Sequence, residues 1–231
     1  MIELFDAYNM PVFKPHAIAM TDMVNESDGQ VVMWTQYCLD YSWIVIRLQE
    51  LLGDLTGKKI LDAGCGKGVL QFYLKKLGAD VYSCDINDYT KQLQTYNKDV
   101  KFTCCNFSDE RQFIPFNDNF FDAVVCVSVL EHMLPFHAQW SCQNFAKLIK
   151  KGGYVLITTD LYKYRMYTEK HIVFSKSDCT DVFCNDELKL LNDYDNFKDC
   201  EQLHFKMSDM FVQNRLIPLL CVPGGVVLTK P

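Results

Sequence analysis

The 231-residue sequence lacks a block of five or six like charges and lacks an apolar run long enough to cross a membrane. Its net charge of -6 leaves no basic surface for a phosphate backbone or anionic lipid, so nucleic acid and membranes are poor partners. The longest apolar stretch, residues 216–228, is broken by prolines and glycines. The first 20 residues contain acids and lack the apolar segment of a secretory signal. We therefore expect a cytoplasmic protein.

The 11 cysteines include no C-x-x-C pair and show no recognisable zinc spacing, so we expect no metal site. Their number is odd, which disfavours a disulfide framework. Several lie within apolar, strand-like runs, namely Cys84, Cys104, Cys105 and Cys126. Buried thiols in a reducing compartment explain this distribution.

Strand-like and helix-like patterns alternate along the middle of the chain. Strands are predicted at residues 60–63, 80–85, 100–106, 121–130 and 154–160, with helices at 69–77, 89–99 and 136–150 between them. The alternation predicts a parallel sheet with helices on both faces, a three-layer α/β/α arrangement. Outside this core, we predict helices at 31–55 and 184–191, and an antiparallel hairpin turning at Pro223, Gly224 and Gly225.

The stretch ILDAGCGKGVL, residues 60–70, places Asp62 at the end of a predicted strand and enters a helix through Gly64, Gly66 and Gly68. Ligands of open α/β sheets bind at this edge, and glycine lets the backbone approach them closely. The dinucleotide fingerprint needs a small residue where Val69 stands, and Asp62 would repel a pyrophosphate. NAD chemistry is therefore disfavoured. Asp85 ends the next strand, where an acid can accept both ribose hydroxyls.

From about Ile60 to Asp160 the chain resembles the class I S-adenosylmethionine-dependent methyltransferases. The matching segments, in order, are ILDAGCGKG, VYSCDIN, IPFNDNFFDAVVCVSVLEHM and LIKKGGYVLIT. The resemblance implies a Rossmann-like doubly wound sheet, mostly parallel with a C-terminal antiparallel hairpin. It implies one methyltransferase domain over 1–231, with an N-terminal arm and helix at 1–55, a cofactor-binding core at 56–160 and a substrate lid with closing strands at 161–231.

The resemblance also implies the residues that hold S-adenosylmethionine. Its methionine part would lie against Asp62, Ala63, Gly64, Cys65, Gly66 and Gly68. Its ribose would bind Asp85 and its adenine would lie against Ile86, with the adenine edge near Asn106 and Phe107 and with Val127 and Ser128 beside the cofactor. Many relatives carry Asp where Asn106 aligns. Alternatively, Asp62 and Asp85 cap a helix or loop, Asn106 is a turn residue and Phe107 belongs to the core.

An aromatic stripe, Trp34, Tyr37 and Tyr41, recurs at helical spacing in the predicted N-terminal helix. Such a stripe is first of all a packing surface. Otherwise one ring could cover the sulfonium through a cation–π contact, and Tyr37 is the candidate for that contact.

The best candidate for a general base is His132, which follows the fourth predicted strand in VLEHM. An imidazole can take a proton from a hydroxyl near neutral pH. Alternatively, Glu131 and His132 only shape the pocket. His171 and Asp160 are weaker candidates. Methyl transfer depends mainly on alignment of the reacting atoms, so a base is not obligatory.

The acceptor is expected to be a small molecule. The fourth predicted strand is not followed by Asn/Asp-Pro-Pro-Tyr/Phe, and no Pro-Cys nucleophile precedes a substrate loop, so methylation of adenine, glutamine amides or cytosine is disfavoured. An O or N atom of a metabolite, sugar or natural-product intermediate remains, with specificity expected from the aromatic segment 162–174. The alternative is a non-catalytic partner or regulatory subunit that binds the cofactor.

Overall fold

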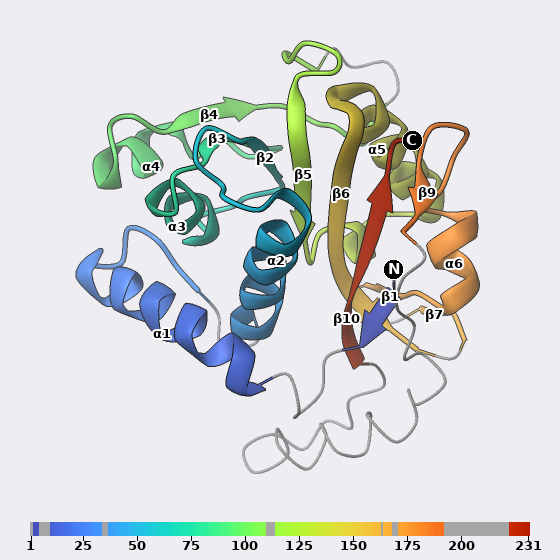
Figure 1. Ribbon diagram of the computed structural model, residues 1–231, viewed down its shortest axis with the longest axis horizontal. Helices are drawn as coiled ribbons and strands as arrows, with labels where there is room; N and C mark the ends of the chain where they lie inside the picture. Colours follow the sequence, from blue (N-terminus) through green and yellow to red (C-terminus); the bar gives the residue numbers. More distant parts are fainter. Residues whose placement is uncertain are drawn as a thin grey trace.

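The computed structural model describes residues 2–4, 10–33, 37–109, 114–162, 164–167, 171–191 and 222–231. A single large sheet runs through it in the strand order β1-β10-β6-β5-β2-β3-β4, with β9 also paired to β10 (Figure 1). A second sheet contains only β7 and β8. The strands are β1 Ile2–Leu4, β2 Lys59–Ala63, β3 Asp80–Asp85, β4 Lys101–Cys104, β5 Phe121–Val127, β6 Ile149–Leu161, β7 Met166–Tyr167, β8 Ile172–Val173, β9 Lys189–Leu190 and β10 Val222–Thr229.

The centre of the sheet is parallel and its order reverses beside β2. β2 pairs in parallel with β3 on one side and with β5 on the other, while β6 continues the parallel run and β10 is antiparallel to it. β5 is buried along nearly its whole length, as expected for a strand covered on both faces. The predicted doubly wound, mostly parallel α/β fold is confirmed. The reversal beside β2 places its carboxyl end, with Asp62, at the switch point where such sheets bind ligands.

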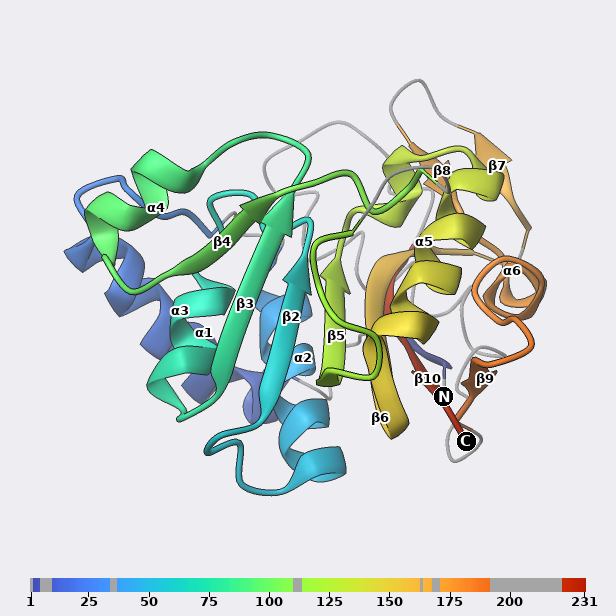
Figure 2. The ribbon, with the colours of Figure 1, turned by 90° about the horizontal axis from the view of Figure 1, so that it is seen from above.

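Helices cover both faces of the sheet (Figures 1 and 2). α1, α2 and α3 lie on one face and α5 lies on the other. The helices are α1 Met10–Glu26, α2 Tyr37–Leu52, α3 Leu70–Lys76, α4 Thr90–Tyr96, the short 3-10 helix η1 Leu130–His132, α5 Pro135–Leu148 and α6 Lys176–Asp181. No helix within the described ranges is both long enough and apolar enough to cross a bilayer.

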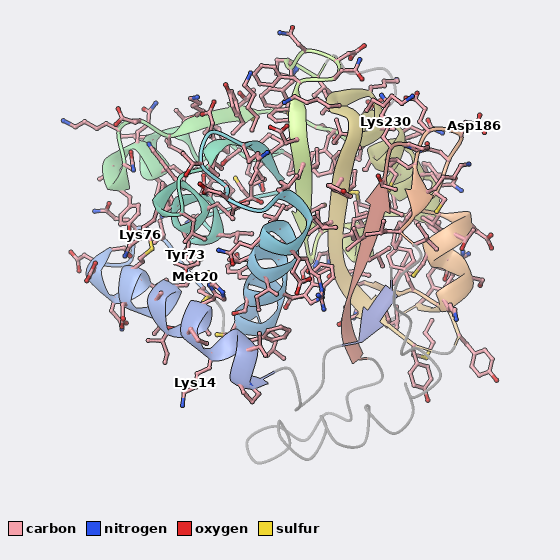
Figure 3. The ribbon with its side chains drawn as sticks, viewed as in Figure 1. Lys14, Met20, Tyr73, Lys76, Asp186 and Lys230 are labelled. Atoms are coloured by element: carbon pink, nitrogen blue, oxygen red, sulfur yellow. The ribbon has the colours of Figure 1, made fainter. Side chains whose placement is uncertain are left out.

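α1 adds an N-terminal layer that the sequence patterns did not predict, because Pro15 and several polar residues interrupt its periodicity. It packs on α2 and α3, and His16 Nδ1 lies 3.0 Å from the Tyr73 hydroxyl. Figure 3 shows Met20 and Tyr73 at the junction of α1 with α3, whereas Lys14 points away from the molecule. The N-terminal arm is therefore built into the fold beside the glycine-containing segment.

Two helix predictions need correction. The helix predicted at 31–55 is α2, Tyr37–Leu52, and the prediction fails at Val32, whose backbone forms a bridge with Gly68 instead. The helix predicted at 184–191 is wrong, since that range contains β9 and the helix α6 lies earlier. Ser175 starts α6 with a capping box in which its side chain accepts from the Asp178 N–H and Asp178 accepts in return.

The turn predicted at Pro223, Gly224 and Gly225 is also wrong, although β10 is antiparallel as expected. These residues lie inside β10, which pairs continuously with β6 from Val222 to Thr229. Gly225 is required there by packing, because a Cβ at this position would lie 2.3 Å from the buried ring of Trp43. The glycine signal therefore marks a close approach between α2 and β10 and not a turn.

Gly225→Ala should lower the free energy of unfolding by about 1–3 kcal/mol, because the methyl group overlaps the Trp43 ring. Urea titration followed by far-ultraviolet circular dichroism measures the change. Trp43→Phe removes the overlapping atoms, so the double variant should lose less stability than the sum of the two single variants. Additive losses would contradict this packing interpretation.

Candidate functional site

The glycine loop after β2, residues 64–68, is anchored to the end of β3 by its own backbone. The N–H groups of Gly64 and Cys65 both donate to the carbonyl oxygen of Cys84, at 2.8 and 3.1 Å. The N–H of Gly66 donates to Asp85 Oδ2 at 3.0 Å. These bonds hold the loop and the acid of β3 together.

The N–H groups of Gly68 and of the next residue, Val69, are bonded within the protein as well. Gly68 N–H donates to Cys65 O at 2.9 Å, and Val69 N–H donates to Val32 O at 3.1 Å. Val32 N–H in turn donates to Lys67 O at 2.9 Å. A phosphate site at a helix N-terminus needs amides that point at the ligand, whereas these are engaged. The geometry supports the prediction of a ligand without a phosphate at this loop.

The three glycines have different surroundings. A Cβ on Gly64 would lie 2.6 Å from Val129 Cγ2, and one on Gly68 would lie 2.5 Å from the Tyr41 hydroxyl. Gly66 has a φ of +50°, and a Cβ there would meet nothing within 4 Å. Gly64 and Gly68 are thus packing glycines, while Gly66 borders open space where a ligand can approach the backbone.

Two carboxyl groups lie at the strand ends beside this loop. Asp62 is 3% exposed, and burial, followed by the charge of Asp85, raises the pKa of Asp62 to about 7. Asp85 is 8% exposed and also accepts the Asn87 N–H at 2.9 Å. A buried acid with a raised pKa is stabilised when a cation approaches it. The pair suits a ligand that carries positive charge.

The residues predicted to contact an adenine line the same end of the sheet, with different side-chain roles. Ile86 is 65% exposed, which is unusual for isoleucine and leaves an apolar surface next to Asp85. Asn106 accepts from Ser108 N–H and Oγ at 3.0 and 2.7 Å, so its side chain forms a local turn. Phe107 is buried against Phe145 with ring centroids 5.2 Å apart. The side chain of Phe107 belongs to the core.

Two further predicted contacts lie nearby and one cannot be placed. Val127 is half-buried at the end of β5, and Ser128 follows it with a φ of +50° and donates its N–H to Thr158 O at 3.0 Å. Tyr37 begins α2, but its side chain and the whole of Trp34 lie outside the described residues. Tyr41, the third member of the aromatic stripe, is buried against Gly68.

The three candidate bases, which are far apart in the sequence, come together at the ends of β5 and β6. His171 Nε2 lies 3.0 Å from Asp160 Oδ2. The rings of His132 and His171 meet edge to face, with centroids 6.0 Å apart and an interplanar angle of 75°. His132 itself is exposed. Each of these residues was predicted as a candidate base on its own, and no sequence pattern indicated that they contact one another.

Buried acids surround this cluster, and sequence reasoning missed one of them. Burial is the largest cause that raises the pKa of Asp40 to about 7, with the charge of Asp160 contributing. Burial, followed by the charge of Asp160, also raises the pKa of Glu131 well above its ordinary value. Thr159 Oγ1 donates to Glu131 Oε2 at 3.3 Å. Asp40 stands in an otherwise apolar part of α2, and that polar exception was the available signal.

The chain matches known proteins over the segment that builds this site. The sequence profile of the family described as "Methyltransferase domain" matches residues 61–157. Over these residues the chain is similar to class I methyltransferase domains. Domains of this class use S-adenosylmethionine, and the open backbone at Gly66, the acids Asp62 and Asp85 and the exposed Ile86 fit a cationic, phosphate-free nucleoside.

One curated relative of this chain is a ubiquinone biosynthesis O-methyltransferase of Alkalilimnicola ehrlichii, 33% identical over 114 residues. The match covers 48% of this chain and 44% of the relative, so it spans less than half the length of that protein.

Solved structures share the fold at low identity. The [4+2]-cyclase SpnF has a TM-score of 0.64 at 14% identity and the match covers 95% of both chains. Coclaurine N-methyltransferase bound to N-methylheliamine and SAH has a TM-score of 0.57 at 13% identity, covering 86% of this chain and 74% of that one. At these identities the likeness shows the fold of the methyltransferase domain and not its reaction.

The raised pKa values of Asp40 and Asp62 should make stability depend on pH. Each is about 7 in the fold against an ordinary 3.8, so the unfolded chain binds fewer protons between these values. The free energy of unfolding should therefore fall as pH rises from about 4 to 7 and level off above. Urea unfolding at a series of pH values measures this decline.

Asp62→Asn should remove about 2–4 kcal/mol of the decline, because a neutral amide has no proton to lose. Asp118→Asn, which changes an exposed carboxylate, is the matched control and should leave the curve unaltered. A decline that persists undiminished in Asp62→Asn would show that this acid is ionised in the fold.

Proposed function

We propose that the chain is an S-adenosylmethionine-dependent methyltransferase that transfers a methyl group to a hydroxyl oxygen of a small molecule. One observation carries the proposal. The N–H groups of Gly64, Cys65, Gly66 and Gly68 are bonded within the protein, while two carboxyl groups, Asp62 and Asp85, stand beside the open side of the loop. This is a site for a cationic nucleoside, and the sulfonium of S-adenosylmethionine supplies an already activated methyl group.

In the proposed complex each residue has a definite task. Asp62 pairs with the cationic end of the cofactor, next to the backbone of Ala63, Gly64, Cys65, Gly66 and Gly68. Asp85 accepts bonds from the ribose hydroxyls while it keeps the Gly66 N–H. Ile86 packs on the adenine, whose edge lies near Asn106 and the backbone of Phe107. Val127 and Ser128 border the cofactor, and Tyr37 remains a candidate to cover the sulfonium.

A hydroxyl acceptor is supported by the name of the matched relative, an O-methyltransferase, and by the histidines at the carboxyl ends of β5 and β6. Proton removal matters more for an alcohol or phenol than for an already neutral amine. Aromatic side chains stand on the segment after β6, where Tyr164 and Tyr167 are exposed. We propose that residues 161–231 form the substrate lid and closing strands of one domain, with 1–55 as its arm and 56–160 as its core.

A reducing, cytoplasmic location is part of the proposal. The nine cysteines within the described residues are all free thiols, and most of them are buried. The cyclase among the structural neighbours shows that this fold also serves another reaction, so binding alone does not establish methyl transfer.

Asp85→Ala should weaken binding of S-adenosylhomocysteine at least about tenfold, because it removes charge-assisted bonds to the ribose. Isothermal calorimetry measures the change, with Asp22→Ala on the outer face of α1 as the control. NAD should show no binding at the same concentrations. A preference for NAD, or an unchanged affinity in Asp85→Ala, would contradict the site assignment.

Binding of the cofactor near neutral pH should release protons, because its positive charge favours the ionised form of Asp62, whose pKa is about 7. Calorimetry in two buffers of different ionisation enthalpy counts the protons. We expect up to about one proton released at pH about 6 and little above pH about 8. Asp62→Asn should abolish the release while Asp40→Asn preserves it. Equal release in Asp62→Asn and wild type would assign the proton to another group.

A further inference from the structure

The side chain of Gln71, in the first turn of α3, carries a buried polar atom without a partner. Gln71 is 2% exposed, and its amide nitrogen Nε2 donates to the carbonyl oxygen of Gly68 at 3.2 Å. Its amide oxygen Oε1 accepts no hydrogen bond from any of the described residues. The large majority of buried side-chain polar atoms in proteins have a partner, so an orphaned oxygen at this depth points to a ligand.

The orientation of the Gln71 amide follows from its bond to Gly68. A carbonyl oxygen can only accept, so the NH2 group of the amide and not its oxygen must face Gly68 O. Turning the amide by 180° would set two acceptors against each other and lose this bond. Oε1 is therefore an acceptor held in a fixed place, and only a donor can satisfy it.

Gln71 lies beside the glycine loop and close to the acid at the end of β2. Its side chain contacts the thiol of Cys65, and the charge of Asp62 acts on the same thiol. The carboxyl group of Asp62 is buried and forms no hydrogen bond with the described residues. Two buried acceptors without donors, one on α3 and one on β2, thus adjoin the same residue of the loop.

The two acceptors together suit a primary ammonium group. The carboxylate of Asp62 supplies the opposite charge and accepts one N–H, while Oε1 of Gln71 accepts another. A sulfonium carries positive charge but has no N–H, so it cannot satisfy the amide oxygen. Of the two cationic groups of S-adenosylmethionine, only the α-ammonium of its methionine part offers such donors.

On the basis of the methyltransferase function proposed above, we propose that Gln71 is a further cofactor-binding residue, whose Oε1 accepts an N–H of the cofactor's α-ammonium group. Asp62 pairs with the charge of the same group. The bond to Gly68 O holds the amide in place before the cofactor binds, so little side-chain freedom is lost on binding. A ligand that lacks the ammonium leaves Oε1 buried and unpartnered, and the site therefore discriminates against that ligand.

Two ligands that differ only in this group test the assignment by calorimetry. S-adenosylhomocysteine has no sulfonium, so the α-ammonium is its only cationic group, and its deamino analogue carries hydrogen in place of that group. Wild-type protein should bind S-adenosylhomocysteine at least about 100-fold more tightly than the analogue. Gln71→Met keeps the length of the side chain without the amide. It should weaken binding of S-adenosylhomocysteine at least about tenfold, and binding of the analogue less than about threefold.

Gln49→Met replaces an exposed glutamine on α2 and is the matched control, which should bind both ligands as the wild-type protein does. If Gln71→Met weakens both ligands equally, Gln71 only shapes the loop and the proposal is overturned. Unchanged affinity of Gln71→Met for S-adenosylhomocysteine would overturn it as well.

The two proposals fail in different ways. A wild-type protein that binds no S-adenosylhomocysteine would defeat the proposed function, and this inference with it. A wild-type protein that binds S-adenosylhomocysteine and the deamino analogue equally well would keep the cofactor assignment and reject the role of Gln71.

A crystal structure of the wild-type protein with S-adenosylhomocysteine tests the contact without any substitution. The α-nitrogen of the ligand should lie about 3 Å from Gln71 Oε1. A water molecule or another donor on Oε1, with the α-nitrogen out of hydrogen-bond reach, would overturn the proposal.

Discussion

The carbonyl oxygen of Cys84 is the anchor on which the site depends. It accepts two N–H groups of the glycine loop, from Gly64 and Cys65, and so fixes where the chain leaves β2 relative to the end of β3. The bond from Gly66 N–H to Asp85 completes the connection. Because these contacts consume backbone donors, the loop presents a shaped opening and not an anion-binding ring. The class of ligand that the loop can bind therefore depends on the backbone hydrogen bonds of the loop as much as on the side chains that line it.

The carboxyl groups at the strand ends place opposing demands on the molecule. Burial of Asp62, Asp40 and Glu131 disfavours their ionised forms and raises their pKa values. Without a cationic ligand, ionisation of these acids therefore destabilises the fold. A site with buried carboxyl groups, whose ionisation is costly, is preorganised to bind a positively charged ligand. The same buried acids therefore affect both the stability of the fold and the binding of a ligand. Asp62 lies beside the glycine loop, whereas Asp40 and Glu131 lie near Asp160 and the two histidines.

The central α/β pattern could be predicted from the sequence because alternating apolar strands and periodic helices carry a local signal, and the acids Asp62 and Asp85 were found by their place at strand ends. Contacts between distant segments left no such signal. The bridge of Val32 to Gly68 interrupts an otherwise helical pattern, and the glycine of β10 is required by a tryptophan on α2. Likewise His171 and Asp160 are adjacent only after β8 returns to β6. The position of a single residue at a strand end could therefore be predicted from the sequence, whereas its contact partner from a distant segment could not.

The outer edge of the sheet joins the two extremes of the chain, since β1 pairs with β10 from Ile2 with Val226 to Leu4 with Gly224. Contacts of such long sequence separation carry the largest closure entropy and form late. The β2 to β6 core can therefore assemble first, while β1 can pair only after β10 has joined the sheet. The strand on which β1 depends, β10, also pairs with Leu161 and Asp160 at the end of β6, so the same late addition covers the acidic end of the sheet.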